Sequence, residues 1–242
     1  MSCIDSRAAS TALVCVCPGA VFRSGIVTLF LLAAALVVAL PAWSAPAFVQ
    51  VAATTPQSAQ SSVALKFQVA QTAGNLNVIV VGWTGSSAHI TGVTDSAGNA
   101  YALAVGPTVQ SGVESAAIYY AMNIAAAAAN TVTVKFDSPA PYVDLRISEY
   151  SGVAGAGALD GVAGASGNGP TANSGTLTTV GSQDLLVAAD YVATSTTGAG
   201  PGFTARIFTS PDGDILEDGI AATASSAPLV ATPVYSASRR ST

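Results

Sequence analysis

The chain has 242 residues, of which 50% are hydrophobic and only 9% are charged, and its formal net charge is −5. Nucleic-acid binding needs clustered Lys and Arg to neutralise phosphates, so this acidic, cation-poor composition argues against a nucleic-acid partner. All three cysteines lie within the first 17 residues, so the rest of the chain offers neither a thiol nucleophile nor a disulfide. Its stability must come from a packed core, for which about 200 residues suffice.

An export signal is predicted at the N-terminus. Residues 26–40 form an apolar run that follows Arg23, and Ala42 and Ser44 have the small side chains that a signal peptidase reads before its cleavage point. We therefore expect a helical signal peptide over residues 1–44 and a protein that is secreted, periplasmic or at the cell surface. Membrane contact is expected only through this segment, if it stays uncleaved.

An uncleaved membrane anchor is the alternative interpretation of the same run. A spanning helix needs about 20 apolar residues, and Pro41 ends this run early, which favours the signal peptide. The stretch before the run is long and weakly basic for a signal. It therefore also indicates an over-extended start, with the true start nearer Val21.

Downstream of residue 44 the pattern is that of β-strands. Short runs rich in Val, Ile, Thr and Tyr, many of them alternating apolar and polar residues, are separated by turn residues. Residues 77–83 are apolar on both faces, which predicts a central strand. The predicted strands are 48–53, 63–69, 77–83, 90–94, 101–105, 115–122, 131–136, 143–150, 177–180, 184–192, 203–209 and 215–222.

These strands predict an all-β fold, a single antiparallel β-sandwich of jelly-roll or immunoglobulin-like type over residues 45–222. Glycine-rich residues 151–175 interrupt the strands, either as a linker between two domains or as a long crossing loop. We favour the loop, because too few strands follow it to build a second sandwich. Residues 223–242 are predicted to be an irregular tail, truncated or frameshifted.

The densest acidic cluster offers ligands for calcium. Residues 210–219 (SPDGDILEDG) contain Asp212, Asp214, Glu217 and Asp218, and calcium binds about six to eight oxygen ligands of this kind. The order is D-G-D, unlike that of an EF-hand loop, and Pro-Asp-Gly is also a good turn sequence. The alternatives are a calcium site and a turn with solvated acids, and no other cofactor is expected.

No catalytic motif is evident. A nucleophile usually needs a base beside it, but the chain has a single histidine, His89, and no serine in a GxSxG elbow. Glu149 is the candidate acid of a glycosidase, because strand alternation places it on the apolar face with Leu145 and Ile147. The sequence pattern shows no second carboxylate opposite it, so we expect no catalytic residue and no enzyme.

Aromatic side chains are the candidate ligand-binding residues, because exposed rings stack on the flat faces of sugars. Trp83, Tyr119 and Tyr120 are the residues proposed for this role. Tyr119 and Tyr120 are neighbours on one predicted strand, so they must point to opposite faces. The alternative is that these rings pack inside the sandwich, with the tyrosine hydroxyls at its rim.

Several segments resemble those of a family of secreted bacterial β-sandwich modules, found beside immunoglobulin-like or fibronectin-type repeats in large extracellular proteins. The segments are AGNLNVIVVGW, VTDSAGNAYALAVGP, IYYAMNIAAAAANTVTVKF, LRISEYSG and GFTARIFTSPDGDILEDG. The resemblance implies a β-sandwich and an extracellular place, but no activity or catalytic residue. The chain departs from it after Ala222, where members continue with a Ser/Thr-rich strand and an apolar, Trp-containing one; losing a closing strand would leave an exposed edge.

The function predicted from the sequence is non-catalytic binding or adhesion outside the cytoplasmic membrane. The expected partner is an extracellular glycan or a protein surface. One alternative is a secreted polysaccharide hydrolase that uses Glu149 with a nearby Asp. The other is a structural spacer or surface domain without a ligand.

Overall fold

The computed structural model describes residues 8–16, 45–155, 157, 159–179, 183–221 and 234–236. These residues form β-strands and connecting loops. No helix lies among them, and therefore none long and apolar enough to cross a membrane. The apolar run 26–40, and with it the predicted signal helix, lies outside the described residues. The all-β class predicted from the sequence is confirmed.

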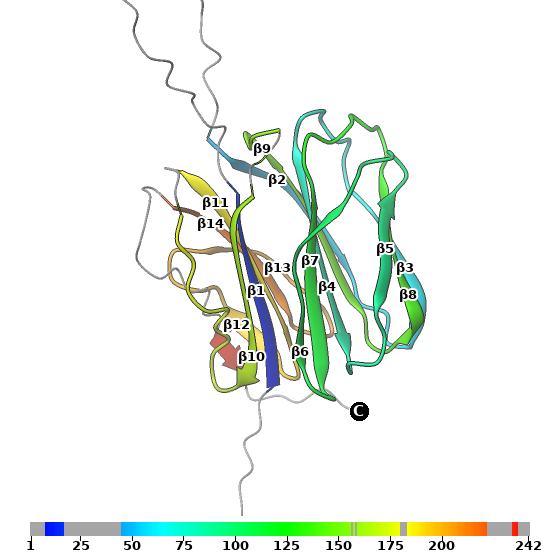
Figure 1. Ribbon diagram of the computed structural model, residues 1–242, viewed down its shortest axis with the longest axis vertical. Helices are drawn as coiled ribbons and strands as arrows, with labels where there is room; N and C mark the ends of the chain where they lie inside the picture. Colours follow the sequence, from blue (N-terminus) through cyan, green and yellow to red (C-terminus); the bar gives the residue numbers. More distant parts are fainter. Residues whose placement is uncertain are drawn as a thin grey trace, which may run out of the picture.

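The strands follow one another along the chain as shown in Figure 1. Their bounds are β1 (Ala8–Val16), β2 (Ala47–Thr54), β3 (Gln60–Lys66), β4 (Leu76–Thr84), β5 (Ile90–Asp95), β6 (Ala102–Gln110), β7 (Glu114–Ala121), β8 (Thr131–Ala140), β9 (Asp144–Ser151), β10 (Leu159–Asn168), β11 (Asp184–Val192), β12 (Ser195–Gly198), β13 (Thr204–Phe208), β14 (Ile215–Ala221) and β15 (Val234–Ser236).

Three antiparallel sheets carry the fold, in an arrangement consistent with a β-sandwich. The central sheet has the order β2-β9-β4-β7-β6, the outer sheet β10-β1-β11-β14-β13 and the short sheet β3-β8-β5. The central sheet is covered on both faces, because one apolar cluster joins it to the outer sheet and another joins it to the short sheet. The strands β12 and β15 form a separate two-stranded ribbon.

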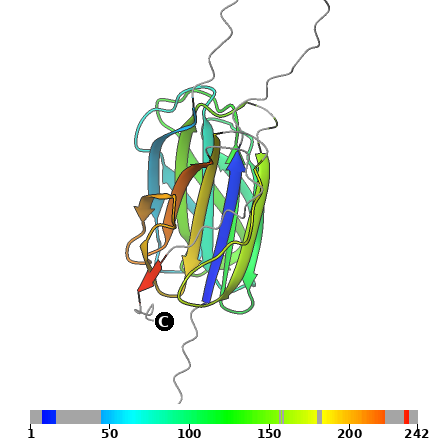
Figure 2. The same cartoon turned by 90° about the vertical axis from the view of Figure 1, so that its left-hand side faces the viewer.

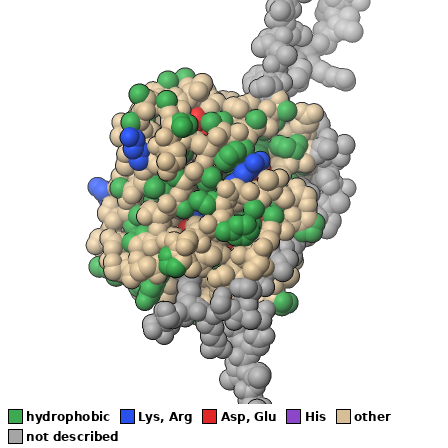
Figure 3. All heavy atoms as spheres, turned by 180° about the vertical axis from the view of Figure 1, so that it is seen from behind, with side chains coloured by type: hydrophobic (Ala, Val, Ile, Leu, Met, Phe, Trp, Pro, Cys, Tyr) green, Lys and Arg blue, Asp and Glu red, His purple; other side chains and the backbone are tan. Residues whose placement is uncertain are grey.

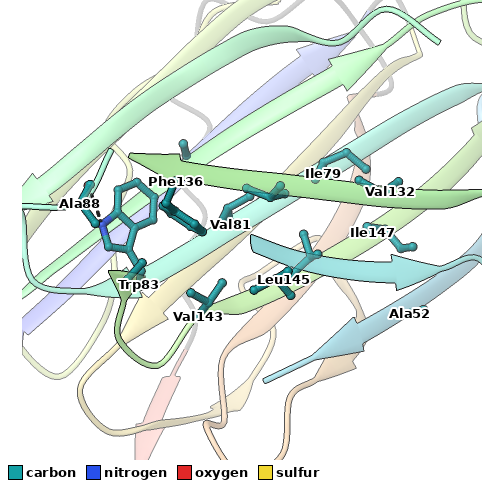
Figure 4. Close-up of a cluster of buried hydrophobic side chains, with 14 of the residues drawn as sticks. Ala52, Ile79, Val81, Trp83, Ala88, Val132, Phe136, Val143, Leu145 and Ile147 are labelled. Atoms are coloured by element: carbon teal, nitrogen blue, oxygen red, sulfur yellow. Dashed lines mark hydrogen bonds between the residues drawn. The ribbon is translucent and has the colours of Figure 1, made fainter. Parts of the chain in front are cut away.

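Strand β4 shows why the central sheet lies in the middle. Val78 and Val80 pack toward the outer sheet, whereas Ile79, Val81 and Trp83 pack toward the short sheet. All five side chains are buried, as the apolar pattern on both faces of this strand predicts. Figure 4 shows the second group, in which Trp83 packs edge-on against Phe136 at 5.5 Å between ring centroids.

The outer sheet takes one of its strands from the N-terminal segment. Strand β1 pairs antiparallel with both β10 and β11, and Figure 2 shows it between them. It therefore separates two strands that are parallel to each other. It falls within residues 1–44, so a chain cleaved after Ser44 would lack this strand; the cleavage itself stays a prediction.

The sequence predicted that the glycine-rich residues 151–175 form a loop, but part of this region is a strand. Residues 159–168 within it form β10, the edge strand beside β1. At Gly161 a Cβ atom would meet the Leu177 side chain at 2.5 Å, so the small residue permits close packing of the next segment. Gly161 is therefore needed for close packing within a strand, and its presence does not indicate a loop.

Candidate functional site

A tight loop joins β13 to β14 and carries two of the predicted metal ligands. The Thr209 amide donates to the Asp214 carbonyl at 2.9 Å, and the Gly213 amide donates to the Thr209 carbonyl at 2.9 Å. Gly213 has φ of 80° and lies against Ser195, which a Cβ atom would approach to 2.5–2.9 Å. The loop is therefore fixed by its own backbone and by the start of β12.

A third carboxylate reaches this loop from the central sheet. Asp144, the first residue of β9, lies beside Asp212 and Asp214, and one carboxylate oxygen of each lies within 4.8 Å of the other two. We call these three residues the acidic cluster. All three side chains are buried, at 0–2% exposure, which is rare for carboxylates without compensating partners.

Arg146 and Asp190 border the acidic cluster. Both side chains are buried, and the Arg146 guanidinium donates to the backbone carbonyls of Ile215 and Asp190. The Nε atom of Arg146 lies 2.9 Å from Oδ1 of Asp144. The guanidinium therefore links the central sheet to β11 and β14, and it neutralises only part of the negative charge around it.

Hydrogen bonds hold the loop carboxylates in place. Asp214 accepts the Val192 amide at 2.8 Å, and Asp212 accepts the Gln57 side-chain amide at 3.0 Å. Asp144 differs: no donor among the described residues has hydrogen-bond geometry toward either of its carboxylate oxygens. Its contacts are the Arg146 ion pair, the Thr209 side chain and the neighbouring acids.

Burial and crowding disfavour the ionised carboxylates here. Burial raises the pKa of Asp144 well above its ordinary value, and the nearby Asp214 raises it further, whereas Arg146 lowers it. Burial, with Asp214, likewise raises the pKa of Asp190 to about 7. Full ionisation of these acids would leave more negative charge than the one guanidinium can balance.

Glu217 and Asp218, the other two predicted calcium ligands, are engaged elsewhere. The Asp218 carboxylate pairs with Arg206 through two hydrogen bonds of 2.7 and 2.8 Å, and Arg206 also lies over the Phe48 ring at 4.3 Å. Glu217 accepts the Gly200 amide at 2.7 Å. The structure thus brings together Asp212 and Asp214 of the predicted set and replaces the rest with Asp144.

Asp144 was not among the ligands predicted from the sequence. Alternation along β9 places Asp144, Arg146 and Ser148 opposite the apolar residues Leu145 and Ile147, where polar side chains are expected to face solvent. This expectation is wrong, because the outer sheet covers this face and all three side chains are buried. Tyr150 shares the face and lies in the core with the outer sheet. Tyr150 alternates with the polar residues on the same face of β9, and a large aromatic side chain there indicates that another layer covers the face.

A cleft lies beside this loop. It has a volume of about 520 Å³ and is lined by residues 53–56 at the end of β2 and 207–210 at the end of β13. Thr55 spans from one wall to the other by donating to the Ser210 carbonyl at 2.9 Å. On the face seen in Figure 3, charged side chains are few and hydrophobic ones lie among polar atoms.

The aromatic residues proposed as a stacking platform lie mainly inside the fold. Trp83 is 1% exposed and donates its indole N–H to the Ala88 carbonyl at 3.1 Å, so its face cannot meet a surface ligand. Tyr119 packs against the core with the short sheet, and Tyr120 against the core with the outer sheet. They point to opposite faces, as expected, and both are half-buried.

Glu149 and His89 occupy different settings. Glu149 is fully buried, and it accepts hydrogen bonds from Gln50, from the Asn75 side chain at 2.6 Å and from the Thr72 amide at 3.2 Å. Its place beside the apolar face is as predicted, but its three donors satisfy it as a structural anion. His89 is exposed and pairs with Asp137 at 3.0 Å.

Comparison of the chain with protein-family models, with curated proteins and with solved structures found no match.

Proposed function

We propose that this protein is a non-catalytic binding module that acts outside the cytoplasmic membrane and holds a glycan in the cleft between β2 and β13. One observation carries the proposal: the cleft combines an exposed aromatic ring with a row of hydroxyl groups. Phe208 is 42% exposed at one wall, and Thr54, Thr55 and Ser210 line the same cleft. A sugar presents an apolar ring face together with hydroxyls, which suits both kinds of group.

The absence of catalysis is inferred from the engagement of the candidate acids. A glycosidase needs two carboxyl groups about 5–10 Å apart in a groove that admits the substrate. Glu149 is buried and held by three donors, and the lining of the cleft contains no carboxylate. These observations favour the binding module over the hydrolase.

The place of action rests on the predicted signal segment. The proposal includes export of an antiparallel sandwich of jelly-roll or immunoglobulin-like type, with residues 45–222 as the exported domain. A charge-poor surface suits contact with neutral extracellular glycans, because it neither attracts nor repels them over long range. No partner nucleic acid is proposed.

A glycan array probed with the labelled full chain tests the proposal. We expect binding to a subset of neutral glycans, and at least a tenfold loss of affinity for Phe208→Ala, because the exposed ring is removed from the cleft. Val69→Ala is the matched control, since Val69 is 57% exposed and lies outside the cleft lining. The proposal would be wrong if no glycan bound, or if Phe208→Ala and Val69→Ala bound glycans equally well. Binding of a protein through Phe208 would show that the ligand of the cleft is a protein and not a glycan.

A further inference from the structure

We infer that Asp144, Asp212 and Asp214 bind a calcium ion that fastens the β13–β14 loop to the central sheet. The three carboxylates come from two distant parts of the chain and converge within 4.8 Å of one another. Calcium–oxygen distances of about 2.3–2.6 Å place any two ligands of one ion at most about 5 Å apart. The spacing therefore allows one ion to contact all three residues.

Charge balance is the first argument. Arg146 is the one buried cation in the part of the chain that the structure describes, and four buried acids lie around it: Asp144, Asp190, Asp212 and Asp214. With all four acids ionised, the group has an excess of three negative charges, and burying unbalanced charge is costly. A divalent cation removes most of this excess.

The unsatisfied Asp144 carboxylate is the second, independent argument. Asp144 is fully buried, and among the described residues no donor is aligned for a hydrogen bond to either of its oxygens. Arg146 already serves two backbone carbonyls from its terminal nitrogens, so only its Nε atom faces Asp144. Asp144 thus lies beside two other carboxylates and the Thr209 side chain, with one ion pair and no aligned hydrogen bond to balance its burial. Such a carboxylate has the surroundings of a metal ligand.

The donor chemistry selects calcium. The ligands are all carboxylates, and the cluster contains neither histidine nor thiolate, which transition metals prefer. Magnesium keeps several waters and usually takes one or two carboxylates, whereas calcium accepts three with irregular geometry. The residues that complete the loop, Thr209 and Ser210, also line the cleft, so calcium would order one of its walls.

Calcium titration of the full chain, first stripped with EDTA, tests the inference. Isothermal calorimetry should show one site, and the melting temperature should rise by about 5–10 °C when free calcium is about one hundred times Kd. Asp212→Asn should remove both responses. Its melting temperature in EDTA should equal or exceed that of the wild type, because one of the repelling charges is gone, so loss of folding is not the cause.

The matched control is Asp137→Asn, which removes an exposed carboxylate outside the cluster and should keep the full calcium response. No heat and no thermal shift in the wild type would overturn the inference, as would an undiminished response in Asp212→Asn. An equal response to magnesium would overturn the choice of calcium. The readouts need no glycan, so they stand or fall separately from the proposed binding function.

Discussion

The two cores on either side of the central sheet are built differently. The core with the short sheet uses strands from one continuous stretch, β2 to β9, and its large side chains are apolar. The outer sheet combines β1 with strands that follow residue 158, and its interface with the central sheet encloses Arg146 and several carboxylates. One half is local and nearly neutral, whereas the other is assembled from distant segments and is rich in charge.

Each half also contains a polar cluster that is buried at least in part, and the two clusters are satisfied in different ways. In the first half, Gln71, Asn77, Tyr101, Asp95 and Asn130 form what we call the amide network. Asn130 donates to Gln71 and Asp95 at 2.7 and 2.8 Å, and Tyr101 donates to Asp95 at 2.8 Å. Burial tends to raise the pKa of Asp95, but the hydrogen bonds from Asn130, Asn99 and Tyr101 together outweigh it and lower the pKa.

The amide network therefore closes on its own donors, whereas Asp144 of the acidic cluster has an ion pair with Arg146 but no aligned hydrogen-bond donor among the described residues. Amide side chains carry donors and acceptors together, so a few of them can satisfy one carboxylate. Four carboxylates around one guanidinium cannot satisfy one another. The contrast predicts that the first half is stable by itself and that the second depends on its N-terminal strand and on a cation.

The largest effect is expected from breaking the N-terminal strand. Leu13 pairs in register with Ala163 and Ala188, and Leu13→Pro removes a backbone donor in the middle of a sheet. We expect a loss of about 3 kcal/mol or more in the free energy of unfolding, with the outer sheet melting first. Hydrogen exchange resolved by segment measures this; Leu13→Val is the control, and uniform destabilisation of both halves would contradict it.

The next effect is expected at Arg146. Arg146→Met removes the only cation that is buried among the described residues, and breaking its pairing with buried acids costs about 3–5 kcal/mol. Urea unfolding in EDTA measures the loss. Added calcium should restore part of the lost stability, because the ion replaces some of the missing positive charge. If calcium left the loss unchanged, the ion and Arg146 would not be coupled.

A smaller loss is expected in the amide network. Asn130→Ala leaves the buried Gln71 acceptor short of a donor, at a cost of about 1–3 kcal/mol, and removes one of several donors from the half-buried Asp95. The same urea unfolding experiment measures it. Calcium should not restore this loss, since the network is closed by protein donors. Recovery with calcium would show that the two halves are not independent.

The smallest effect concerns pH. Burial raises the pKa of Glu217 to about 7 from an ordinary value of 4.5, so the folded protein holds this proton at pH values where the unfolded chain has lost it. Stability from this group therefore falls as pH rises from about 4.5 to about 7. Glu217→Gln should lose that dependence.

The comparison is made in EDTA by thermal melting at pH 5 and pH 8. We expect Glu217→Gln to gain about 2–6 °C over the wild type at pH 8 relative to pH 5. Asp137→Asn is the control, because its carboxylate is exposed and its pKa is lowered by hydrogen bonds from His89, so it should show no such gain. An equal gain in both variants would exclude Glu217 as the source.

The alternation of apolar and polar residues along single strands predicted much of the half that is built from the continuous stretch β2 to β9. The apolar faces of residues 77–83 placed β4 at the centre, and the parity of Glu149 with Leu145 and Ile147 was correct. The outer sheet was not predictable in this way. The pairing of Ala8 with Asn168 joins residues far apart in the sequence, and no nearby residue signals it.

The candidate site was half predictable for the same reason. Asp212 and Asp214 are two residues apart, so their proximity follows from the turn that contains them. Asp144 reaches them only because the outer sheet packs on its face of β9. Alternation shows which residues share a face of a strand, but it does not show whether another sheet covers that face.

The position of β1 has a consequence for where this chain can reside. Once β1 and β2 belong to one folded body, Val16 and Ala47 lie on the same side of any membrane. The intervening residues, including the apolar run 26–40, then cannot cross a bilayer a single time. Pairing of β1 and single-pass translocation of residues 45–242 are thus alternative fates for one molecule, and which occurs depends on whether β1 pairs before the run meets a membrane.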